Sequence, residues 1–391
     1  MTAPLCALDL SRMYRDRYVK VQAAMRAANV DVLVLCGANN VTYATGARTP
    51  AADQMRASWW RAVAVIEAAG GWPRIYTEFP ESIPSELPAE VVHQAVEVET
   101  PAGARQLVAE LPAGTVAIDD APFPLWAALE PRSPVDASVV LAPAKLTKTL
   151  DELECIRQAQ AINEEAIRLT RPFAVPGARA TDCSGAFLRA IAELGCTANT
   201  VDPVFQVMPK SVAAGPYSVT GEVVYPLPTR PQELAVGDVM WVDTGINLFG
   251  YASDYGATWV IGRAPDELQR DQFTRWRAIV DRALAAVRPG ATAADLTAAA
   301  GVDRAGKRPW LSYFYLAHGC GTDSAEMPFV GTDLGDAFDA SLVLQPGMVL
   351  VFEPVVWDDG RAGHRSEEIV AVSETGYVRL SEPATLDPGS S

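Results

Sequence analysis

The sequence of residues 237–262 is GDVMWVDTGINLFGYASDYGATWVIG. Runs rich in β-branched and aromatic residues flank the letters NLFG, whose glycine suits a backbone position with positive φ, and this pattern predicts a β-hairpin. If the turn is centred between Leu248 and Phe249, Asp243 lies directly opposite Asp254, with the Cβ atoms about 4.5–5.5 Å apart. Opposed carboxylates among apolar neighbours destabilise a sheet unless a positive charge compensates them. The hairpin therefore indicates a divalent-metal site.

A second pair of carboxylates repeats this symmetry near the C-terminus. Residues 349–353 form an apolar run that ends in Glu353, and residues 365–372, which contain Glu367, form the expected return strand. The two glutamates are equidistant from Gly360 in the turn between them. These two side chains are therefore also predicted to share one face of a hairpin.

His318 supplies a fifth donor, because it follows an aromatic strand and precedes a glycine-rich turn that leaves room around the imidazole. Taken singly, a strand-end carboxylate is usually a solvated turn residue, and a buried histidine usually has a structural partner. Together, the five donors match the ligand set of paired cations that prefer carboxylate and imidazole.

These stretches resemble the motifs of the pita-bread metallohydrolases, which include creatinase, aminopeptidase P, prolidase and methionine aminopeptidase. The resemblance spans about residues 147–380, and residues 40–46 (NVTYATG) resemble a segment of that family's N-terminal domain. The matching motifs are Asp243-Thr244-Gly245, Gly250-Tyr251-Ala252-Ser253-Asp254, His318-Gly319-Cys320-Gly321, Glu326-Met327-Pro328, Pro346-Gly347-Met348, Glu353-Pro354 and Gly363-His364-Arg365-Ser366-Glu367.

The resemblance implies that two divalent metal ions are held by Asp243, Asp254, His318, Glu353 and Glu367. In such enzymes the ions share bridging carboxylates, polarise the scissile carbonyl and turn a bridging water into hydroxide near neutral pH. The hard carboxylate ligands favour Mn²⁺, with Zn²⁺, Co²⁺ and Fe²⁺ as alternatives.

The resemblance also implies roles for other side chains. Glu353 would take the proton of the attacking water. Arg365 lies two residues before the last ligand on the same strand face, so it would orient that carboxylate or hold substrate. Glu326 would have a catalytic role, and Tyr251 and Thr258 would bind substrate.

Three positions depart from the peptidases of this family. Those enzymes carry one histidine shortly before the first metal strand, where this chain has Tyr225-Pro226, and another before the Glu-x-Pro motif, where it has Ala325. The arginine of their Ser-Asp-x-Thr-Arg-Thr motif is replaced by Ala257. The two histidines serve substrate binding and proton delivery to the leaving amine, a contribution of about 10²- to 10⁴-fold in rate. The sequence thus predicts the metal site but leaves the substrate open.

Three functions follow from these observations. The leading hypothesis is a metal-dependent hydrolase of the Xaa-Pro peptidase type that acts on a small peptide or a related amide. The alternative is non-peptidase chemistry on another small molecule, such as carbon–sulfur elimination by a dimethylsulfoniopropionate lyase, although such a lyase carries an extra acidic residue where this chain has Gly245. The third is a catalytically silent binding module. The retention of all five ligands argues against it. An aspartic-protease interpretation of residues 243–245 fails because the chain supplies no second such aspartate.

Two domains are expected, because 391 residues exceed the roughly 250–300 that one hydrophobic core supports. Residues 1–146 alternate helix and strand patterns and resemble the creatinase-type α/β domain, and residues 147–391 resemble the pita-bread catalytic domain, so the fold class is α/β (α+β). Pro176-Gly177 and Pro289-Gly290 each follow one helix and precede another, which favours duplicated halves with pseudo-two-fold symmetry. The alternative is that Pro-Gly merely ends helices.

Within the first domain, a helix is expected from Ser11, as its N-cap, to about Ala28. His93 is expected on a strand or at the surface rather than as a ligand. Thr149 is expected to open the first helix of the second domain with a capping box. The strands expected in the first domain are Val30–Leu35, Ala62–Ile66, Arg74–Thr77 and Thr115–Asp119.

The composition argues against several classes of function. A formal charge of −16 without a basic cluster argues against nucleic acid as a partner, and no apolar run is long enough to cross a membrane. The N-terminus lacks a basic region followed by an apolar one, so a cytoplasmic location is expected. The six scattered cysteines predict buried thiols rather than disulfides or a zinc knuckle. The family resemblance implies a homodimer.

Overall fold

The computed structural model describes residues 2–48, 61–196, 198–200, 202–210, 229–311, 314–332 and 334–387. The chain divides into two compact units. One unit is Leu8–Asp151, and the other combines Met1–Ala7 with Glu152–Ser391.

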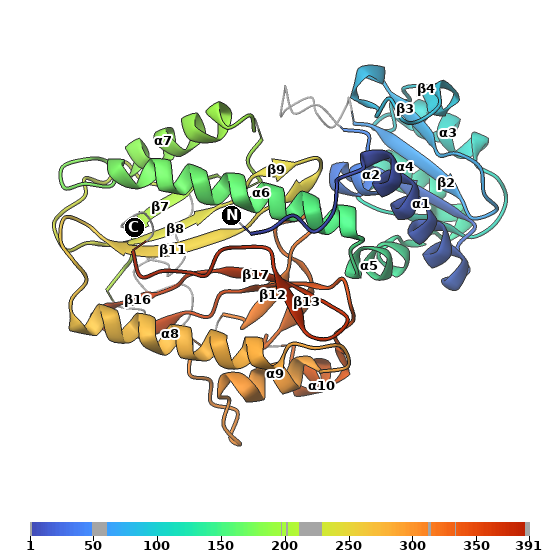
Figure 1. The fold of residues 1–391 in the computed structure, drawn as a ribbon. Coiled ribbons are helices and arrows are strands. Elements are labelled where there is room, and N and C mark those ends of the chain that lie inside the picture. Colours follow the sequence, from blue (N-terminus) through green and yellow to red (C-terminus); the bar gives the residue numbers. More distant parts are fainter. Residues whose placement is uncertain are drawn as a thin grey trace. The chain divides into compact units, whose positions relative to one another are not determined.

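The first unit is an α/β structure in which each predicted strand is present within two residues of its expected bounds. It contains β1 (Val32–Leu35), β2 (Val63–Glu67), β3 (Arg74–Thr77), β4 (Val92–Gln94), β5 (Val116–Ile118) and β6 (Val135–Asp136), with helices α1 (Leu10–Ala27), α2 (Ala38–Thr45), α3 (Pro101–Glu110), α4 (Phe123–Leu129) and α5 (Ser138–Leu146). The strands form one mixed sheet in the order β4-β3-β2-β1-β5-β6 (Figure 1). His93 lies on β4, as predicted.

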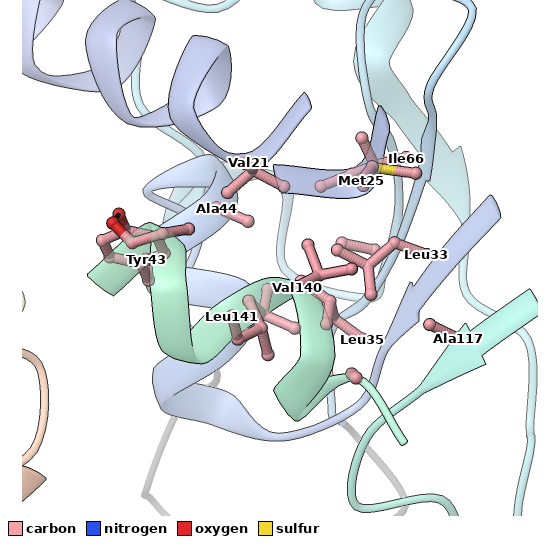
Figure 2. Packing of buried hydrophobic residues seen from close by; sticks show 14 of the residues in the cluster. Val21, Met25, Leu33, Leu35, Tyr43, Ala44, Ile66, Ala117, Val140 and Leu141 are labelled. Carbon is pink, nitrogen blue, oxygen red and sulfur yellow. Dashed lines mark hydrogen bonds between the residues drawn. The ribbon is translucent and has the colours of Figure 1, made fainter. Parts of the chain in front are cut away.

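The central strand β1 is buried along its whole length, and its alternate side chains enter two different cores. Leu33 and Leu35 pack on one face with residues such as Met25 of α1 (Figure 2). Val32 and Val34 belong to the core on the opposite face. A strand that is covered on both faces needs a continuous apolar sequence, which explains the run VLVL.

The first helix is capped by Asp9 rather than by Ser11, so the predicted cap was wrong. The Asp9 carboxylate accepts a hydrogen bond from the backbone N–H of Arg12 at 2.9 Å. Ser11 lies inside the first turn. The carboxylate is the better cap here because it satisfies a free N–H and also interacts favourably with the positive end of the helix dipole.

The second unit is layered, with its two larger sheets between helices α6 and α7 on one side and α8 and α9 on the other (Figure 1). The helices are α6 (Leu150–Thr170), α7 (Ala180–Glu193), α8 (Glu267–Ala286), α9 (Ala293–Ala300) and α10 (Asp336–Ser341). The strands are β7 (Val204–Val207), β8 (Val239–Thr244), β9 (Asn247–Leu248), β10 (Tyr251–Ala252), β11 (Tyr255–Val260), β12 (Ala317–Gly319), β13 (Glu326–Val330), β14 (Val349–Phe352), β15 (Val356–Asp358), β16 (Ala362–His364), β17 (Glu368–Val372) and β18 (Tyr377–Arg379). The larger sheets have the orders β11-β8-β7 and β13-β12-β14-β17-β18.

Backbone hydrogen bonds show that the two halves of this unit repeat one pattern. In the first half the N–H of Gly177 donates to the carbonyl of Leu234 at 2.8 Å. In the second half the N–H of Gly290 donates to the carbonyl of Leu344 at 2.9 Å. In each half the glycine comes from the predicted Pro-Gly pair and the leucine precedes a central strand. The duplication predicted from the sequence is therefore present in the backbone.

The first residues of the chain form hydrogen bonds to a buried ion pair on α6. Glu154 and Arg157 lie 2.7 Å apart, the N–H of Leu5 donates to Glu154 at 3.0 Å, and Arg157 donates to the carbonyl of Thr2 at 3.0 Å. Burial would raise the pKa of Glu154, but Arg157, Gln158 and the Leu5 N–H outweigh this effect and lower the pKa to about 2.

This carboxylate is expected to make the fold sensitive to acid. Its pKa in the folded protein lies below the ordinary value of 4.5, so its ionisation stabilises the fold above about pH 4.5, and this stabilisation is lost as the pH falls toward 2. We expect Glu154→Gln to lower the free energy of unfolding at neutral pH by about 1–2 kcal/mol, and to lose less stability than the wild type on acidification. Urea unfolding at neutral and acidic pH measures both effects.

Glu165→Gln is the matched control, because Glu165 forms an exposed i,i+3 pair with Arg168 on the same helix. It should change the free energy of unfolding by less than about 0.5 kcal/mol. An equal loss of stability on acidification in the wild type and in Glu154→Gln would contradict the prediction.

Among the described residues, no helix combines the length and the apolar character needed to cross a membrane. All six cysteines are free thiols. Five of them are buried, as predicted, and Cys6 is partly exposed.

Candidate metal centre

The first hairpin forms, but its register differs by two residues from the prediction: Asp243 lies opposite Gly256 rather than opposite Asp254. The turn is centred between Phe249 and Gly250, which have φ values of 54° and 87°. Two-residue turns of this kind match the twist of the strands and need positive φ at both central positions, so the glycine lies inside the turn. Asp254 precedes Gly256 by two residues and therefore still faces the same side as Asp243.

The second hairpin has the predicted register. Phe352 of β14 lies opposite Glu368 of β17, and β15 and β16 continue the same register toward the turn. Glu353 and Glu367 are the next pair in this register, where the regular strands are interrupted. In the duplicated pattern Glu353 corresponds to Asp243, since each lies nine residues after the leucine that accepts the glycine N–H.

Side chains from both hairpins and from β12 converge in one buried cluster. Carboxylate oxygens of Asp243, Asp254 and Glu367 lie within 4.8 Å of one another. The Nε2 atom of His318 lies 3.3 Å from Asp254 Oδ2 and 3.0 Å from Glu353 Oε1. None of the five residues is more than 7% exposed. We refer to the four acidic residues as the carboxylate cluster.

His318 presents Nε2 to these carboxylates. Its Nδ1 lies 2.8 Å from the carbonyl oxygen of Gly319, and because a carbonyl can only accept, Nδ1 carries the hydrogen. The ring of Tyr315 packs edge-on against the imidazole at 5.3 Å. Burial would lower the pKa of His318, but Glu353 and Asp254 outweigh this effect and raise it to about 9. The ring is thus held in place by its neighbours, with Nε2 toward the carboxylates.

One guanidinium group lies among the carboxylates. Arg365 Nη1 is 3.0 Å from Asp243 Oδ2, and Nε donates to Glu353 Oε2 at 2.9 Å. Nη2 contacts both Glu353 and Glu367. The guanidinium carbon lies 5.0 Å from the centre of the Trp241 ring. Three of the four carboxylates therefore share this positive charge.

The cluster holds more negative charge than one guanidinium neutralises. Burial and the neighbouring carboxylates raise the pKa of Asp254 to about 7, although His318 opposes them, and they raise the pKa of Glu367 well above its ordinary value. Burial would also raise the pKa of Glu353, but Arg365 and His318 lower it to about 2. Buried carboxylates with excess negative charge, together with one imidazole, fit hard divalent cations.

The hydroxyl groups of two residues predicted to bind substrate form hydrogen bonds to other groups of the protein. Tyr251 is buried, and its hydroxyl donates to Glu152 of α6 at 2.7 Å. The hydroxyl of Thr258 accepts a hydrogen bond from the backbone N–H of Arg365 at 3.0 Å and donates to its carbonyl at 2.7 Å. Thr258 therefore fixes the backbone that carries the guanidinium. The role of both residues with substrate stays a prediction.

The two glycines after His318 allow β12 to pass close to β13. A Cβ atom on Gly319 would lie less than 3.0 Å from the backbone of Met327, and one on Gly321 less than 3.0 Å from the carboxylate of Glu326. Gly319 pairs with Glu326 next to a register shift between the two strands. The His-Gly-x-Gly sequence thus brings Glu326 close to the end of the histidine strand, and its catalytic role stays a prediction.

Two polar residues of α6 hold the first hairpin, and the sequence reasoning missed both. Asn163 donates to the carbonyl of Thr244 at 2.8 Å and to the hydroxyl of Ser253 at 3.0 Å. Gln160 accepts a hydrogen bond from the N–H of Asp254 at 3.3 Å. The signal that could have found them is a pair of amides three residues apart on the apolar face of a helix, because buried amides need partners.

The positions that depart from the peptidase pattern lie in different surroundings. Ala257 is buried in the hydrophobic core beside α6 and α7, and Ala325 is exposed. Residues 225–226 lie outside the described part of the chain. A Cβ atom on Gly245 would lie less than 3.0 Å from the hydroxyl of Thr200, so the acidic residue expected of a lyase would require Thr200 to shift.

Comparison with known proteins assigns the sequence to a family and identifies similar dipeptidases. Residues 154–374 match metallopeptidase family M24. The chain is 28% identical over 386 residues to the probable dipeptidase PepE of Mycobacterium tuberculosis, with 95% of each chain covered. It is 26% identical over 245 residues to the Xaa-Pro dipeptidase of Pyrococcus furiosus, with 62% of this chain and 65% of that one covered.

Solved structures show the same fold over nearly the whole chain. Dipeptidase PepE from Mycobacterium ulcerans has a TM-score of 0.72 at 25% identity and covers 97% of this chain and 98% of its own. The prolidase from Pyrococcus horikoshii has a TM-score of 0.74 at 18% identity and covers 94% of this chain and 99% of its own. At that identity the second likeness concerns the fold alone. The predicted fold class, a creatinase-type α/β domain followed by a pita-bread domain, is confirmed.

Proposed function

Since the chain belongs to metallopeptidase family M24, and is thus a metallopeptidase-type hydrolase, we propose that it cleaves small peptides as an Xaa-Pro-type aminopeptidase or dipeptidase. Two divalent metal ions would be held by the carboxylate cluster and His318. The observation that carries the proposal is the convergence of five buried donors from separate strands. The dipeptidase names of the relatives support the substrate class.

The contacts divide the donors into two overlapping groups. Asp243, Asp254 and Glu367 form one group, and His318 with Asp254 and Glu353 forms the other. Asp254 belongs to both, so it would be shared between the two ions. When bound, divalent ions supply a Lewis acid for the scissile carbonyl and a hydroxide nucleophile near neutral pH.

The chain's own residues would position and move protons around this centre. We assign to Glu353 the proton of the attacking water, because the family resemblance implies this role and because its carboxylate lies inside the cluster, in contact with both His318 and Arg365. Arg365 would keep the carboxylates of Glu353 and Glu367 oriented. Glu326, beside Gly321, would be a further proton carrier.

Three finer features belong to the same proposal. Hard carboxylate donors favour Mn²⁺ over softer-ligand metals. We also expect a homodimer, which the family resemblance implies, and a cytoplasmic location. Sedimentation velocity of the purified protein measures the oligomeric state, and a monomer at micromolar concentration would contradict the homodimer.

The substrate class is tested with purified protein whose bound metal has been counted. Proline-containing dipeptides and dimethylsulfoniopropionate are offered in parallel, each with EDTA and with added Mn²⁺. We expect release of free amino acids that EDTA abolishes and Mn²⁺ restores. Release of dimethyl sulfide would replace the peptidase by the lyase, and turnover of neither substrate class by metal-loaded protein would contradict the proposed peptidase activity.

A further inference from the structure

A phenol lies beside the carboxylate cluster at Tyr315, three residues before His318. The Tyr315 ring packs edge-on against the imidazole, with the ring centres 5.3 Å apart. It also lies 6.0 Å from the ring of Phe329, the residue that pairs with His318 across β12 and β13. These two rings hold the phenol next to one of the proposed metal ligands.

The electrostatic surroundings of Tyr315 also place it near the cluster. Burial and three of the carboxylates raise its pKa, with Glu353 the strongest of the three, although Arg365 opposes them. The side chain is nevertheless partly exposed, whereas none of the five proposed ligands is more than 7% exposed. The phenol is therefore more accessible than the ligands to a molecule that approaches from the solvent.

The hydroxyl of Tyr315 has no hydrogen-bond partner among the residues that the structure describes. The two side chains predicted to bind substrate differ from it in this respect. Tyr251 donates its hydroxyl hydrogen to Glu152 at 2.7 Å. Thr258 donates to the carbonyl of Arg365, also at 2.7 Å. Of these three hydroxyls, that of Tyr315 is the one available to a ligand.

A hydrogen-bond donor at this position fits a need of the proposed reaction. Both histidines that serve the substrate in peptidases of this family are replaced, at Tyr225-Pro226 and at Ala325. The oxygen of a scissile carbonyl gains negative charge when the bond is attacked, and a positioned donor stabilises that charge. We propose that Tyr315 is a catalytic residue whose hydroxyl donates a hydrogen bond to this oxygen in the transition state. The proposal rests on the peptidase function proposed above.

The chemistry of a phenol favours this role over delivery of a proton to the leaving amine. A proton donor works best when its pKa is near the working pH, and an ordinary phenol has a pKa of about 10. A hydrogen-bond donor only has to stay protonated, which a phenol does at neutral pH. The hydroxyl is therefore suited to stabilising charge on the substrate.

The test compares Tyr315→Phe, which removes only the hydroxyl oxygen, with the wild type in the presence of Mn²⁺. We expect kcat for a cleaved dipeptide to fall about 100-fold while KM stays within about threefold, because the lost bond is made in the transition state. A phosphinic analogue of the dipeptide, whose anionic oxygen imitates the charged carbonyl oxygen, should bind about 100-fold more weakly by titration calorimetry. The melting temperature and the Mn²⁺ affinity should keep their wild-type values.

Tyr377→Phe is the matched control. Tyr377 is a partly exposed tyrosine on β18, an edge strand of the sheet that contains β12, and its ring centre lies 5.9 Å from the guanidinium carbon of Arg379. Its replacement should leave kcat within about twofold of wild type and the affinity for the phosphinic analogue unchanged. Wild-type kcat in Tyr315→Phe overturns the proposed role. A fall in kcat with an equally large loss of Mn²⁺ affinity also overturns it, since the hydroxyl would then only support His318.

The same measurements separate a failure of this role from a failure of the peptidase function. Wild-type protein that binds Mn²⁺ but neither cleaves peptides nor binds the phosphinic analogue overturns both. Wild-type protein that cleaves the dipeptide and binds the analogue, with Tyr315→Phe equal to it in both respects, overturns only the role of Tyr315.

Discussion

Replacing Asp254 with asparagine is expected to lower kcat/KM for a cleaved dipeptide by about 1,000-fold or more and to remove tightly bound metal. Asp254 is the carboxylate that belongs to both groups of donors, since it lies in the cluster with Asp243 and Glu367 and also contacts His318. Asparagine keeps the shape of the side chain but removes the charge that a divalent ion needs. Steady-state kinetics with Mn²⁺ and metal analysis of the purified variant measure the two losses.

The melting temperature in EDTA shows whether the loss comes from misfolding. Burial and the neighbouring carboxylates raise the pKa of Asp254 to about 7, so its ionisation destabilises the fold as the pH rises through that range. At about pH 8 the neutral asparagine should therefore melt at or above the wild-type temperature in EDTA. A lower melting temperature would attribute the loss of activity to the fold instead.

Asp358→Asn is the control for a carboxylate in a hairpin outside the cluster. Asp358 is at the end of β15 and contacts Arg275 and Gln272 of α8. Its replacement should leave kcat/KM within about twofold of wild type. Activity of Asp254→Asn equal to that of Asp358→Asn would remove Asp254 from the proposed metal centre.

The second hairpin shows what local sequence determines well. Its register follows from a turn at Gly360, from which Glu353 and Glu367 are equidistant, and both glutamates therefore occupy the predicted positions. By strand alternation His364 faces away from Glu367, and its ring packs against Phe273 and Trp276 of α8. Turn position and side-chain period were sufficient for these predictions.

The first hairpin shows where local reasoning was limited. Its turn contains Phe249 at positive φ, a conformation that sequence preferences assign to Asn, Asp or Gly, so the turn was misplaced by one residue and the register by two. The two aspartates still share a face because a shift of two residues preserves the alternation. Their convergence was thus predictable, but the residues directly opposite each of them were not.

The contacts between the two hairpins could not be predicted from turn positions and strand alternation. The N–H of Glu367 donates to the carbonyl of Gly256 at 3.0 Å, which joins the second hairpin to β11 of the first. This bond connects segments about a hundred residues apart and brings Arg365 to Asp243. No periodicity within either hairpin encodes it. The amides of Asn163 and Gln160 were missed for the same reason, since their partners lie on another element.

Gly319→Ala is expected to lower both stability and activity. A methyl group there would lie less than 3.0 Å from the carbonyl oxygen and carbon of Met327, and a backbone cannot rotate away as a side chain can. The strands β12 and β13 must therefore separate, at a cost of about 1–3 kcal/mol in the free energy of unfolding. The adjacent His318 would move with β12, so kcat/KM should also fall by about 10- to 100-fold. Urea unfolding and dipeptide kinetics on the same preparation measure both effects.

Gly321→Ala tests the catalytic role of Glu326 separately from the packing of β12 against β13. Its methyl group would meet the carboxylate of Glu326, the far end of a flexible side chain that can turn away, so the free energy of unfolding should change by less than about 1 kcal/mol. If Glu326 transfers protons during the reaction, displacing its carboxylate should still lower kcat, by about tenfold or more. Wild-type kcat in Gly321→Ala, with the expected loss of stability in Gly319→Ala, would leave Glu326 without a catalytic role and assign both glycines to the close approach of β12 and β13.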